Sequence, residues 1–271
     1  MSDAFKAFEA AGWSERAGTF ETLVARATAH AIEPLLDAAG VTAGTRVLDV
    51  GCGLGDLAAA AAARGAHATG SDLAEGMVEA ARRRHPGIEF QVADAERLPF
   101  ADGAFDATVS AFVVNHMPDP ERGAAELVRV TRHGGRVALA MWGPFDRVGL
   151  LGLPARAAES VGIADDEGPG GPSSTRFTDA GELTGLLAGL EDVTLAELDF
   201  TLPVASFDAL WTGVLGGTVR TSRRLAAGGD AAREALARVA EPYRAGDGYA
   251  LPTLVRIASG RRRRSRAATP S

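Results

Sequence analysis

The stretch VLDVGCGLGD (residues 47–56) predicts how the chain starts its sheet and where it binds a ligand. Residues 46–50 are expected to form a short buried strand, because the run is mostly apolar and contains a single acid, Asp49. The glycines that follow stand at every second position: Gly51, Gly53 and Gly55. An alanine-rich segment over residues 56–64 then predicts a helix. A glycine-rich turn between a first strand and its helix is where open α/β sheets bind ligands.

The alternation of strand and helix continues to residue 142. The expected strands are residues 46–50, 67–72, 88–94, 105–112 and 136–142. The expected helices between them are residues 56–64, 75–85 and 120–131. Strands that alternate with helices of about ten residues are typical of a parallel sheet with helices on both faces. The sequence therefore predicts an α/β fold of the doubly wound type.

The flanking segments predict further helices and strands. The expected helices are residues 3–11, 20–39, 177–190 and most of 206–245. The expected strands are residues 192–202 and 251–259. Residues 146–176 are rich in Gly, Pro, Asp and Ser, so we expect part of this segment to be a mobile loop.

Charge and cysteine content exclude several classes of function. The net charge of −7 argues against a broadly basic surface for nucleic acid. The basic run RRRRSR (residues 261–266) is expected to belong to a solvated, flexible tail over residues 261–271. One cysteine, Cys52, excludes an internal disulfide and a cysteine-based zinc cluster, and we expect no metal.

The distribution of apolar residues indicates where in the cell the protein is expected. No run of 18 apolar residues occurs, and the N-terminal segment MSDAFKAFEAAG lacks the basic start and apolar core of a signal peptide. We therefore expect a cytoplasmic protein without membrane insertion. The oligomeric state stays open.

The acids around the glycine turn indicate the charge of the ligand. The spacing differs from the dinucleotide motif G-x-G-x-x-G, and no phosphate-binding lysine follows it. Asp49 and Asp56 would repel a pyrophosphate, and they suit a ligand with ammonium and sulfonium charges. Asp72 ends the second strand about 20 residues past the turn, where an acid can accept hydrogen bonds from ribose hydroxyls. Asp94 ends the third strand, where it could bind an adenine amino group.

Five stretches together resemble the class I S-adenosylmethionine-dependent methyltransferases, and within them the small-molecule subgroup of ubiquinone and menaquinone biosynthesis. The stretches are VLDVGCGLGD, GSDLAEGM, VADAERLPF, FDATVSAFVVNHMPD and ELVRVTRHGGRVALAMWG. The resemblance covers residues 45–142 and extends more loosely to the two later strands. It implies a Rossmann-like, seven-stranded sheet whose last strand is antiparallel, with S-adenosylmethionine as cofactor and S-adenosylhomocysteine as product.

The resemblance also implies a domain organisation. Residues 1–44 would be N-terminal helices that form part of a cap over the acceptor. Residues 45–260 would be the methyltransferase domain, with a late helical insertion near residues 206–245. Residues 261–271 would be the basic tail.

The resemblance implies cofactor contacts at the positions of this sequence that match the family motifs. The implied cofactor-binding residues are Asp49, Gly51, Cys52, Gly53, Gly55, Asp72, Leu73, Met77, Asp94, Ala95, Ala111 and His116. In this assignment Asp49 supports the cofactor ammonium group and Asp72 holds the ribose. Leu73 and Met77 pack on the adenine, and Cys52 has the alternative of being a small buried filler. Arg16 is a candidate for the cofactor carboxylate.

The candidate catalytic residue is His116, in VVNHMPD after the fourth strand. An imidazole titrates near neutral pH and can take a proton from a phenol or hydroxyl. A packing or cofactor-contacting role for His116 stays open. The candidate acceptor-pocket residues lie outside the shared motifs: Phe5, Phe8, Trp13, Phe20, Trp142, Phe145, Asp146, Phe207, Trp211, Tyr243 and Tyr249. They would clamp a flat, apolar acceptor.

The predicted function is methyl transfer to a small metabolite of the secondary-metabolite or quinone type, with O or C favoured over N. An alternative is a relative that binds the cofactor and catalyses a rearrangement or cyclisation without methylation. A nicotinamide-dependent oxidoreductase is disfavoured by the glycine spacing and Asp49. Nucleic-acid or protein methylation is disfavoured because no N/D-P-P-Y/F motif follows the fourth strand. The acceptor itself stays open.

Overall fold

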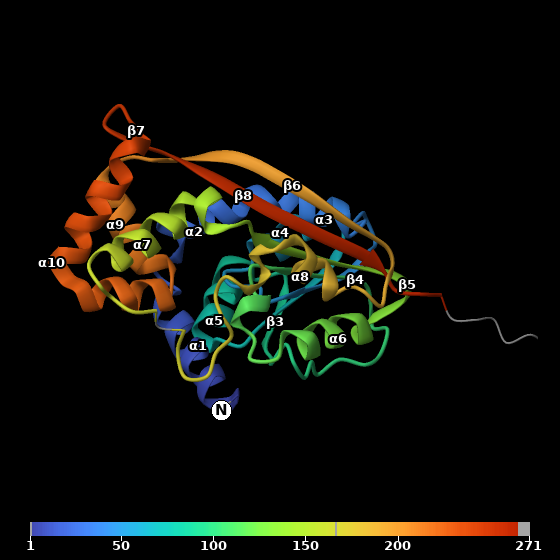
Figure 1. Cartoon of the computed structure of the whole chain (residues 1–271). Coiled ribbons are helices and arrows are strands. Elements are labelled where there is room, and N and C mark those ends of the chain that lie inside the picture. The colour runs from blue at the N-terminus through green and yellow to red at the C-terminus, as the bar shows by residue number, and fades with distance from the viewer. Residues whose placement is uncertain (1, 166, 265–271) are drawn as a thin grey trace, which may run out of the picture.

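A computed structural model describes residues 2–165 and 167–264 (Figure 1). Its sheet has the strand order β3-β2-β1-β4-β5-β8-β6, and a short strand, β7, pairs with β8. The strands are β1 Arg46–Val50, β2 His67–Asp72, β3 Glu89–Val92, β4 Phe105–Ala111, β5 Thr131–Trp142, β6 Glu191–Val204, β7 Arg244–Ala245 and β8 Gly248–Arg261. The first five run parallel, and β8 is antiparallel to both β5 and β6. The predicted α/β sheet with an antiparallel last strand is confirmed.

Ten α-helices in the described residues surround the sheet. They are α1 Ser2–Arg16, α2 Val24–Thr28, α3 Ile32–Ala38, α4 Asp56–Ala63, α5 Glu75–Arg84, α6 Pro120–Val130, α7 Gly149–Ser160, α8 Ala180–Gly185, α9 Phe207–Gly217 and α10 Arg220–Ala240. In Figure 1, α7, α9 and α10 lie together at one end of the molecule, beyond the central strands. None of these helices is long and apolar enough to cross a membrane.

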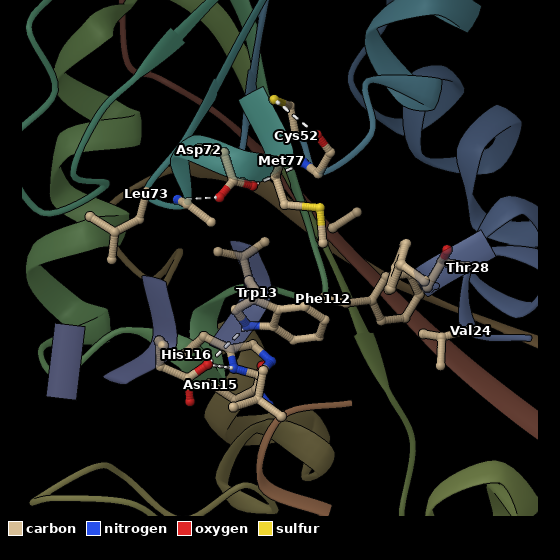
Figure 2. A pocket seen from close by; sticks show the side chains of 18 of the residues that line it. Trp13, Val24, Thr28, Cys52, Asp72, Leu73, Met77, Phe112, Asn115 and His116 are labelled. Carbon is tan, nitrogen blue, oxygen red and sulfur yellow. Dashed lines mark hydrogen bonds and ion pairs between the residues drawn. The ribbon is translucent and has the colours of Figure 1, made fainter. Parts of the chain in front are cut away.

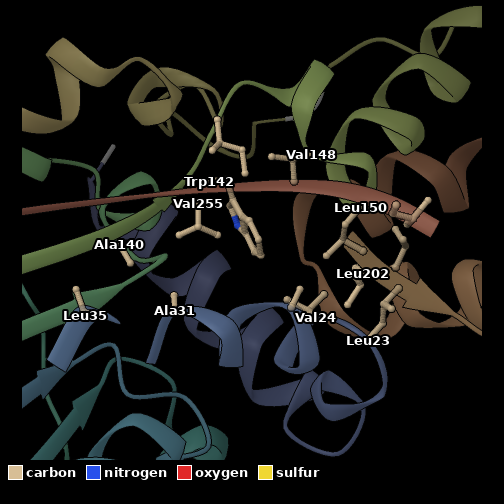
Figure 3. Close-up of a cluster of buried hydrophobic side chains, with 14 of the residues drawn as sticks. Leu23, Val24, Ala31, Leu35, Ala140, Trp142, Val148, Leu150, Leu202 and Val255 are labelled. Atoms are coloured by element: carbon tan, nitrogen blue, oxygen red, sulfur yellow. The ribbon is translucent and has the colours of Figure 1, made fainter. Parts of the chain in front are cut away.

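Alternate residues of the central strands pack into two separate cores. Ala138 and Ala140 of β5 face a core shared with α2, α3, α7, α9 and α10, part of which appears in Figure 3. Val137 and Leu139 face the opposite core, with α6 and α8. Because side chains of a strand point alternately to the two faces of a sheet, β5 is buried on both faces. This packing on both faces holds the carboxyl ends of the parallel strands in place.

Several segments differ from the sequence prediction, and strand β5 starts at Thr131, five residues before the predicted range. Residues 20–39 are not one helix: a 3₁₀ turn at Phe20–Thr22 and another at Ala29–Ala31 interrupt them. In residues 146–176, expected to be partly a mobile loop, Gly149–Ser160 forms helix α7 because Leu150, Leu153 and Ala157 are fully buried. Of the helix expected at 177–190, only α8 is α-helical.

The first two arginines of the predicted basic tail are held by the sheet. Arg261 belongs to β8, and its guanidinium pairs with Asp192 at 2.6 Å. Arg262 donates to the backbone oxygens of Arg129 and Thr131. These contacts anchor the first arginines of the run to the sheet, whereas residues 265–271 lie outside the described part of the chain.

Candidate functional site

A cavity of about 240 Å³ lies at the carboxyl ends of β1, β2 and β4. Eleven of the twelve predicted cofactor residues line it: Asp49, Gly51, Cys52, Gly53, Asp72, Leu73, Met77, Asp94, Ala95, Ala111 and His116. Helix α1 contributes Lys6, Glu9, Ala10 and Trp13, and the α9–α10 junction contributes residues 217–221. Figure 2 shows Asp72 and Met77 on one side of this pocket and His116 and Asn115 on the other. The sheet thus brings distant predicted residues together.

Gly55 is the exception among the predicted contacts. A Cβ added to it would lie 2.7 Å from the ring of Phe90 and 3.0 Å from His85, so this face of Gly55 points toward β3 and the end of α5. Its φ of 86° places it in the left-handed conformation directly before α4. Gly55 therefore serves the turn and the packing behind the cavity, and it does not line the cavity itself.

Gly51 and Gly53 differ in the space around them. Both have positive φ, at 74° and 52°. A Cβ on Gly51 would lie 2.3 Å from Val113, so the fold itself requires glycine there. A Cβ on Gly53 would meet nothing within 4 Å, although Gly53 lines the cavity. The second glycine therefore keeps space open for a ligand.

We predict that Gly53→Ala weakens binding of S-adenosylmethionine about tenfold and destabilises the fold by only about 1–2 kcal/mol, the usual cost of a left-handed side-chain-bearing residue. Gly44→Ala is the matched control, because Gly44 has φ 79°, is equally open and does not line the cavity. Calorimetric binding and thermal unfolding check both variants. Equal affinities in the two would contradict an open cradle at Gly53.

Asp72 accepts backbone hydrogen bonds with both carboxylate oxygens, one from the glycine turn and one from the start of α5. Its Oδ2 accepts from the backbone N–H of Gly53 and its Oδ1 accepts from that of Ala74, each at 2.9 Å. Each oxygen of an ionised carboxylate has a second lone pair, so Asp72 can accept further hydrogen bonds from a ligand. Burial raises the pKa of Asp72, and the backbone hydrogen bonds work against that rise.

Asp49 is a buried acid with a free oxygen. Its exposed fraction is 2%, and its Oδ2 has no hydrogen-bond partner in the described chain. Burial, followed by the neighbouring charge of Asp72, raises the pKa of Asp49 to about 8. A buried carboxyl group without a partner is costly, and a cation placed beside it would remove that cost. The site therefore fits the ammonium group of a cofactor.

We predict that cofactor binding releases a proton from Asp49. In the free protein the raised pKa keeps Asp49 largely protonated at neutral pH, whereas a bound cation favours the carboxylate and lowers that pKa. Affinity should therefore rise with pH between about 6 and 7.5, by up to about tenfold per unit. Calorimetry in buffers of different ionisation enthalpy counts the proton. Asp49→Asn should abolish the release, and a wild type that releases none would contradict the assignment.

Lys6 pairs with Asp94, the acid that was expected to bind the adenine amino group. Its Nζ lies 2.8 Å from Asp94 Oδ2 and 2.6 Å from Glu96 Oε2. Burial opposes the charge of Lys6, but hydrogen bonds and charges from the two carboxylates raise its pKa overall. Asp94 Oδ1 accepts from the backbone of Glu96 at 2.9 Å. Sequence reasoning placed Asp94 in the cavity but missed that helix α1 pairs with it.

His116 lies in a buried polar cluster. Its Nδ1 is 2.9 Å from Glu9 Oε2, which also accepts from Trp13 Nε1 at 2.9 Å. Arg220 approaches the other Glu9 oxygen at 3.3 Å and donates to the backbone oxygen of Asn115 at 2.9 Å. Glu9 and Arg220 were not predicted from the sequence.

Aromatic side chains line the part of the cavity near His116. The Phe112 ring lies 4.2 Å from that of Trp142, and Trp13 meets Phe20 edge-to-face at 5.9 Å. Phe112 has φ 62°, which is uncommon and costly for a bulky residue. Its backbone N–H donates to Ala140 at 2.7 Å, which holds it there. Such strain is concentrated at functional sites, so it supports a role for this wall.

Only part of the predicted acceptor set lines the cavity. Trp13, Phe20, Trp142 and Phe145 do so. The others do not line it: Phe5, Phe8, Asp146, Phe207, Trp211, Tyr243 and Tyr249. Arg16 also lies elsewhere, where its guanidinium binds the backbone oxygen of Gly12 and the hydroxyl of Ser222. Cys52 lines the cavity but packs against Ala58 and Phe90, and burial raises the pKa of its thiol.

Comparison with known proteins finds similarity to methyltransferases. Residues 48–139 match a family model described as a methyltransferase domain. The demethylmenaquinone methyltransferase of Beutenbergia cavernae is 41% identical over 116 residues, which are 41% of this chain and 48% of that protein. The chain spans about half the length of the curated relatives it matches.

Solved structures share the fold at low identity. The YcgJ protein from Bacillus subtilis aligns with TM-score 0.57 and 21% identity, covering 88% of this chain and all of that one. The [4+2]-cyclase SpnF aligns with TM-score 0.56 and 20% identity, covering 87% and 82%. Residues 48–139 thus match a methyltransferase domain, and the chain resembles the class I S-adenosylmethionine-dependent methyltransferases. Within that class it resembles enzymes of menaquinone biosynthesis.

Proposed function

We propose that this protein transfers the methyl group of S-adenosylmethionine to an oxygen or carbon atom of a small, flat and largely apolar acceptor of the quinone or secondary-metabolite type. The observation that carries the proposal is one cavity with two unlike parts. One part has the open Gly53 and the unpaired Asp49 oxygen, which suit a cationic cofactor. The other has aromatic walls beside His116.

The residues of the first part would hold the cofactor. Asp72 would accept from the ribose hydroxyls, and Asp49 would pair with the ammonium group. Leu73 and Met77 would pack on the adenine. When bound, S-adenosylmethionine supplies an electrophilic methyl group on a sulfonium centre. The protein's main tasks are then to align the acceptor in line with that methyl group and to exclude water.

The second part would position the acceptor and take its proton. Phe112 and Trp142 offer an aromatic surface to a planar ring, with Trp13 on the helix that covers the cavity. His116 would accept the proton of an acceptor hydroxyl. The demethylmenaquinone methyltransferases among the relatives support a quinone-type acceptor.

The cap would come from both ends of the chain, with the N-terminal helices at residues 1–44 and the insertion near residues 206–245. Helix α1 and the α9–α10 junction both contribute to the cavity wall, which supports this arrangement. The alternative, a rearrangement or cyclisation without methylation, is not favoured by the comparisons. SpnF shares only the fold at 20% identity, whereas the methyltransferases match in sequence.

Transfer from methyl-deuterated S-adenosylmethionine tests the proposal. The protein is incubated with hydroxynaphthoquinols, substituted phenols and a pooled metabolite extract, and mass spectrometry follows label and S-adenosylhomocysteine. We expect a labelled product whose formation at limiting cofactor is strongly reduced in Asp72→Asn. Binding of the cofactor together with an unlabelled transformed metabolite would overturn methyl transfer and favour the alternative. Failure of the wild type to bind S-adenosylmethionine would overturn both.

A further inference from the structure

Glu9 is a buried acid that faces the cavity from helix α1. Its exposed fraction is 2%, although it belongs to an N-terminal helix with an exposed face. Three groups surround the carboxylate: His116 Nδ1 and Trp13 Nε1 at 2.9 Å, and Arg220 Nε at 3.3 Å. Burial of an acid without such partners would be strongly unfavourable, so this arrangement needs an explanation beyond helix packing.

The charges of the cluster settle where the protons lie. Burial acts to raise the pKa of Glu9, but the neighbouring His116, Arg220 and Trp13 outweigh burial and lower it. An ionised carboxylate can only accept hydrogen bonds, so Nδ1 of His116 must carry a proton. Arg220 Nη2, 3.4 Å from Nδ1, is also a donor and cannot bond to it. The neutral imidazole then has its lone pair on Nε2.

Nε2 is the atom available to a substrate. None of the described residues forms a hydrogen bond with it, and His116 lines the cavity. Trp13 meets the imidazole edge-to-face with ring centroids 5.3 Å apart, which fixes the ring from one side. The positive charge of Arg220 is shared between two acids, because its Nη1 also pairs with Glu167 at 2.8 Å. Arg220 therefore leaves Glu9 available to His116.

We propose that Glu9 is a positioning residue that holds His116 as the Nδ1–H tautomer, with Nε2 as the base toward the acceptor. This inference rests on the proposed function. The acceptor O–H bond breaks and its proton passes to Nε2, while the oxygen forms a bond to the methyl carbon. The methyl–sulfur bond breaks, and its electron pair stays on the sulfur. Glu9 stabilises the imidazolium, which then loses its proton to water.

The charged groups that face His116 come from three elements packed around it. Glu9 lies on α1, Arg220 on α10 and Asp72 at the end of β2, where its charge also interacts with His116. Two of them reach Nδ1: Glu9 at 2.9 Å and Arg220 at 3.4 Å. Glu9 is the nearer of the two and the only acceptor, so it sets the tautomer. Docking of α1 onto the sheet is thus a condition for an active base.

Nitrogen-15 NMR of histidine-labelled protein tests the inference directly. Two-bond proton–nitrogen correlations distinguish the two neutral tautomers, and His116→Ala assigns the signal among the five histidines. We expect His116 to be the Nδ1–H tautomer in the wild type and to lose that preference in Glu9→Gln. An Nε2–H tautomer in the wild type would overturn the proposal without any variant, and so would an unchanged spectrum in a folded Glu9→Gln protein.

Enzyme kinetics provide a second, independent test of the role of Glu9. In Glu9→Gln we expect kcat to fall about tenfold or more, with cofactor affinity nearly unchanged. Glu15→Gln is the matched control, because Glu15 lies on the same helix with a side chain 78% exposed. Equal turnover in the two variants would overturn the positioning role. The NMR result needs no substrate, so failure of methyl transfer itself is recognised separately, by a wild type that shows the Nδ1–H tautomer but transfers no label.

Discussion

Replacing Asp72 with asparagine is expected to weaken binding of S-adenosylmethionine by about ten- to a hundredfold. Hydrogen bonds to a charged group contribute about 1.5–3 kcal/mol, and each 1.4 kcal/mol corresponds to a factor of ten. The variant loses the negative charge, and its amide has one oxygen where the carboxylate used two, for Gly53 and Ala74. The glycine turn and the ribose contact therefore weaken together. Titration calorimetry with the cofactor measures the change.

The control for this variant is Asp102→Asn. Asp102 lies in the turn before β4, at the amino end of that strand, whereas the cavity lies at the carboxyl ends. Its side chain is 74% exposed. The Asp102→Asn substitution removes one negative charge, as Asp72→Asn does, but leaves the cavity unchanged. If both variants bind the cofactor as tightly as the wild type, Asp72 does not hold the ribose, and the carry-over from the family motif fails at this position.

Short strands that end at a glycine or an aspartate were predictable. The ranges 46–50 and 67–72 match β1, a mostly buried run that ends before Gly51, and β2, a more polar strand that ends at Asp72. The start of β5 was not predictable. Its first residues, from Thr131 to Gly135, are polar and contain two glycines, of which Gly134 has φ 77°. The strand starts at Thr131 because this residue pairs with Phe105 before the register shifts. Such pairing depends on a partner strand, not on local pattern.

The acids that follow the strands were predicted to lie at one site, and the charged residues of helix α1 were not. Asp49, Asp72 and Asp94 follow strands, and parallel strands end at one edge of the sheet. Glu9 and Lys6 lie on a helix whose polar residues, taken from sequence alone, are expected in solvent. Their partners are 107 and 88 residues away, so only tertiary packing brings them to the cavity. One signal was present: Lys6 is the only lysine of the chain.

Replacing His116 with alanine is expected to lower turnover by about 10²–10⁴-fold, the usual contribution of a general base. The loss should fall on kcat, because the Asp49 and Asp72 contacts of the cofactor side stay in place. A residue that only packs against Trp13 would give a different pattern, with weaker cofactor binding and a smaller loss of turnover. Single-turnover transfer of labelled methyl, measured at saturating cofactor, separates the two.

The nature of the acceptor atom sharpens this test. Transfer to a hydroxyl requires removal of a proton, whereas transfer to a carbon that is already ionised, or to a neutral amine, does not require a base in the same step. The His116→Ala variant should therefore lose most activity toward weakly acidic hydroxyls and least toward acceptors that are ionised before they bind. Equal losses for both kinds of acceptor would show that His116 acts through packing. A loss graded with acceptor acidity would identify His116 as the proton acceptor and oxygen as the methylated atom.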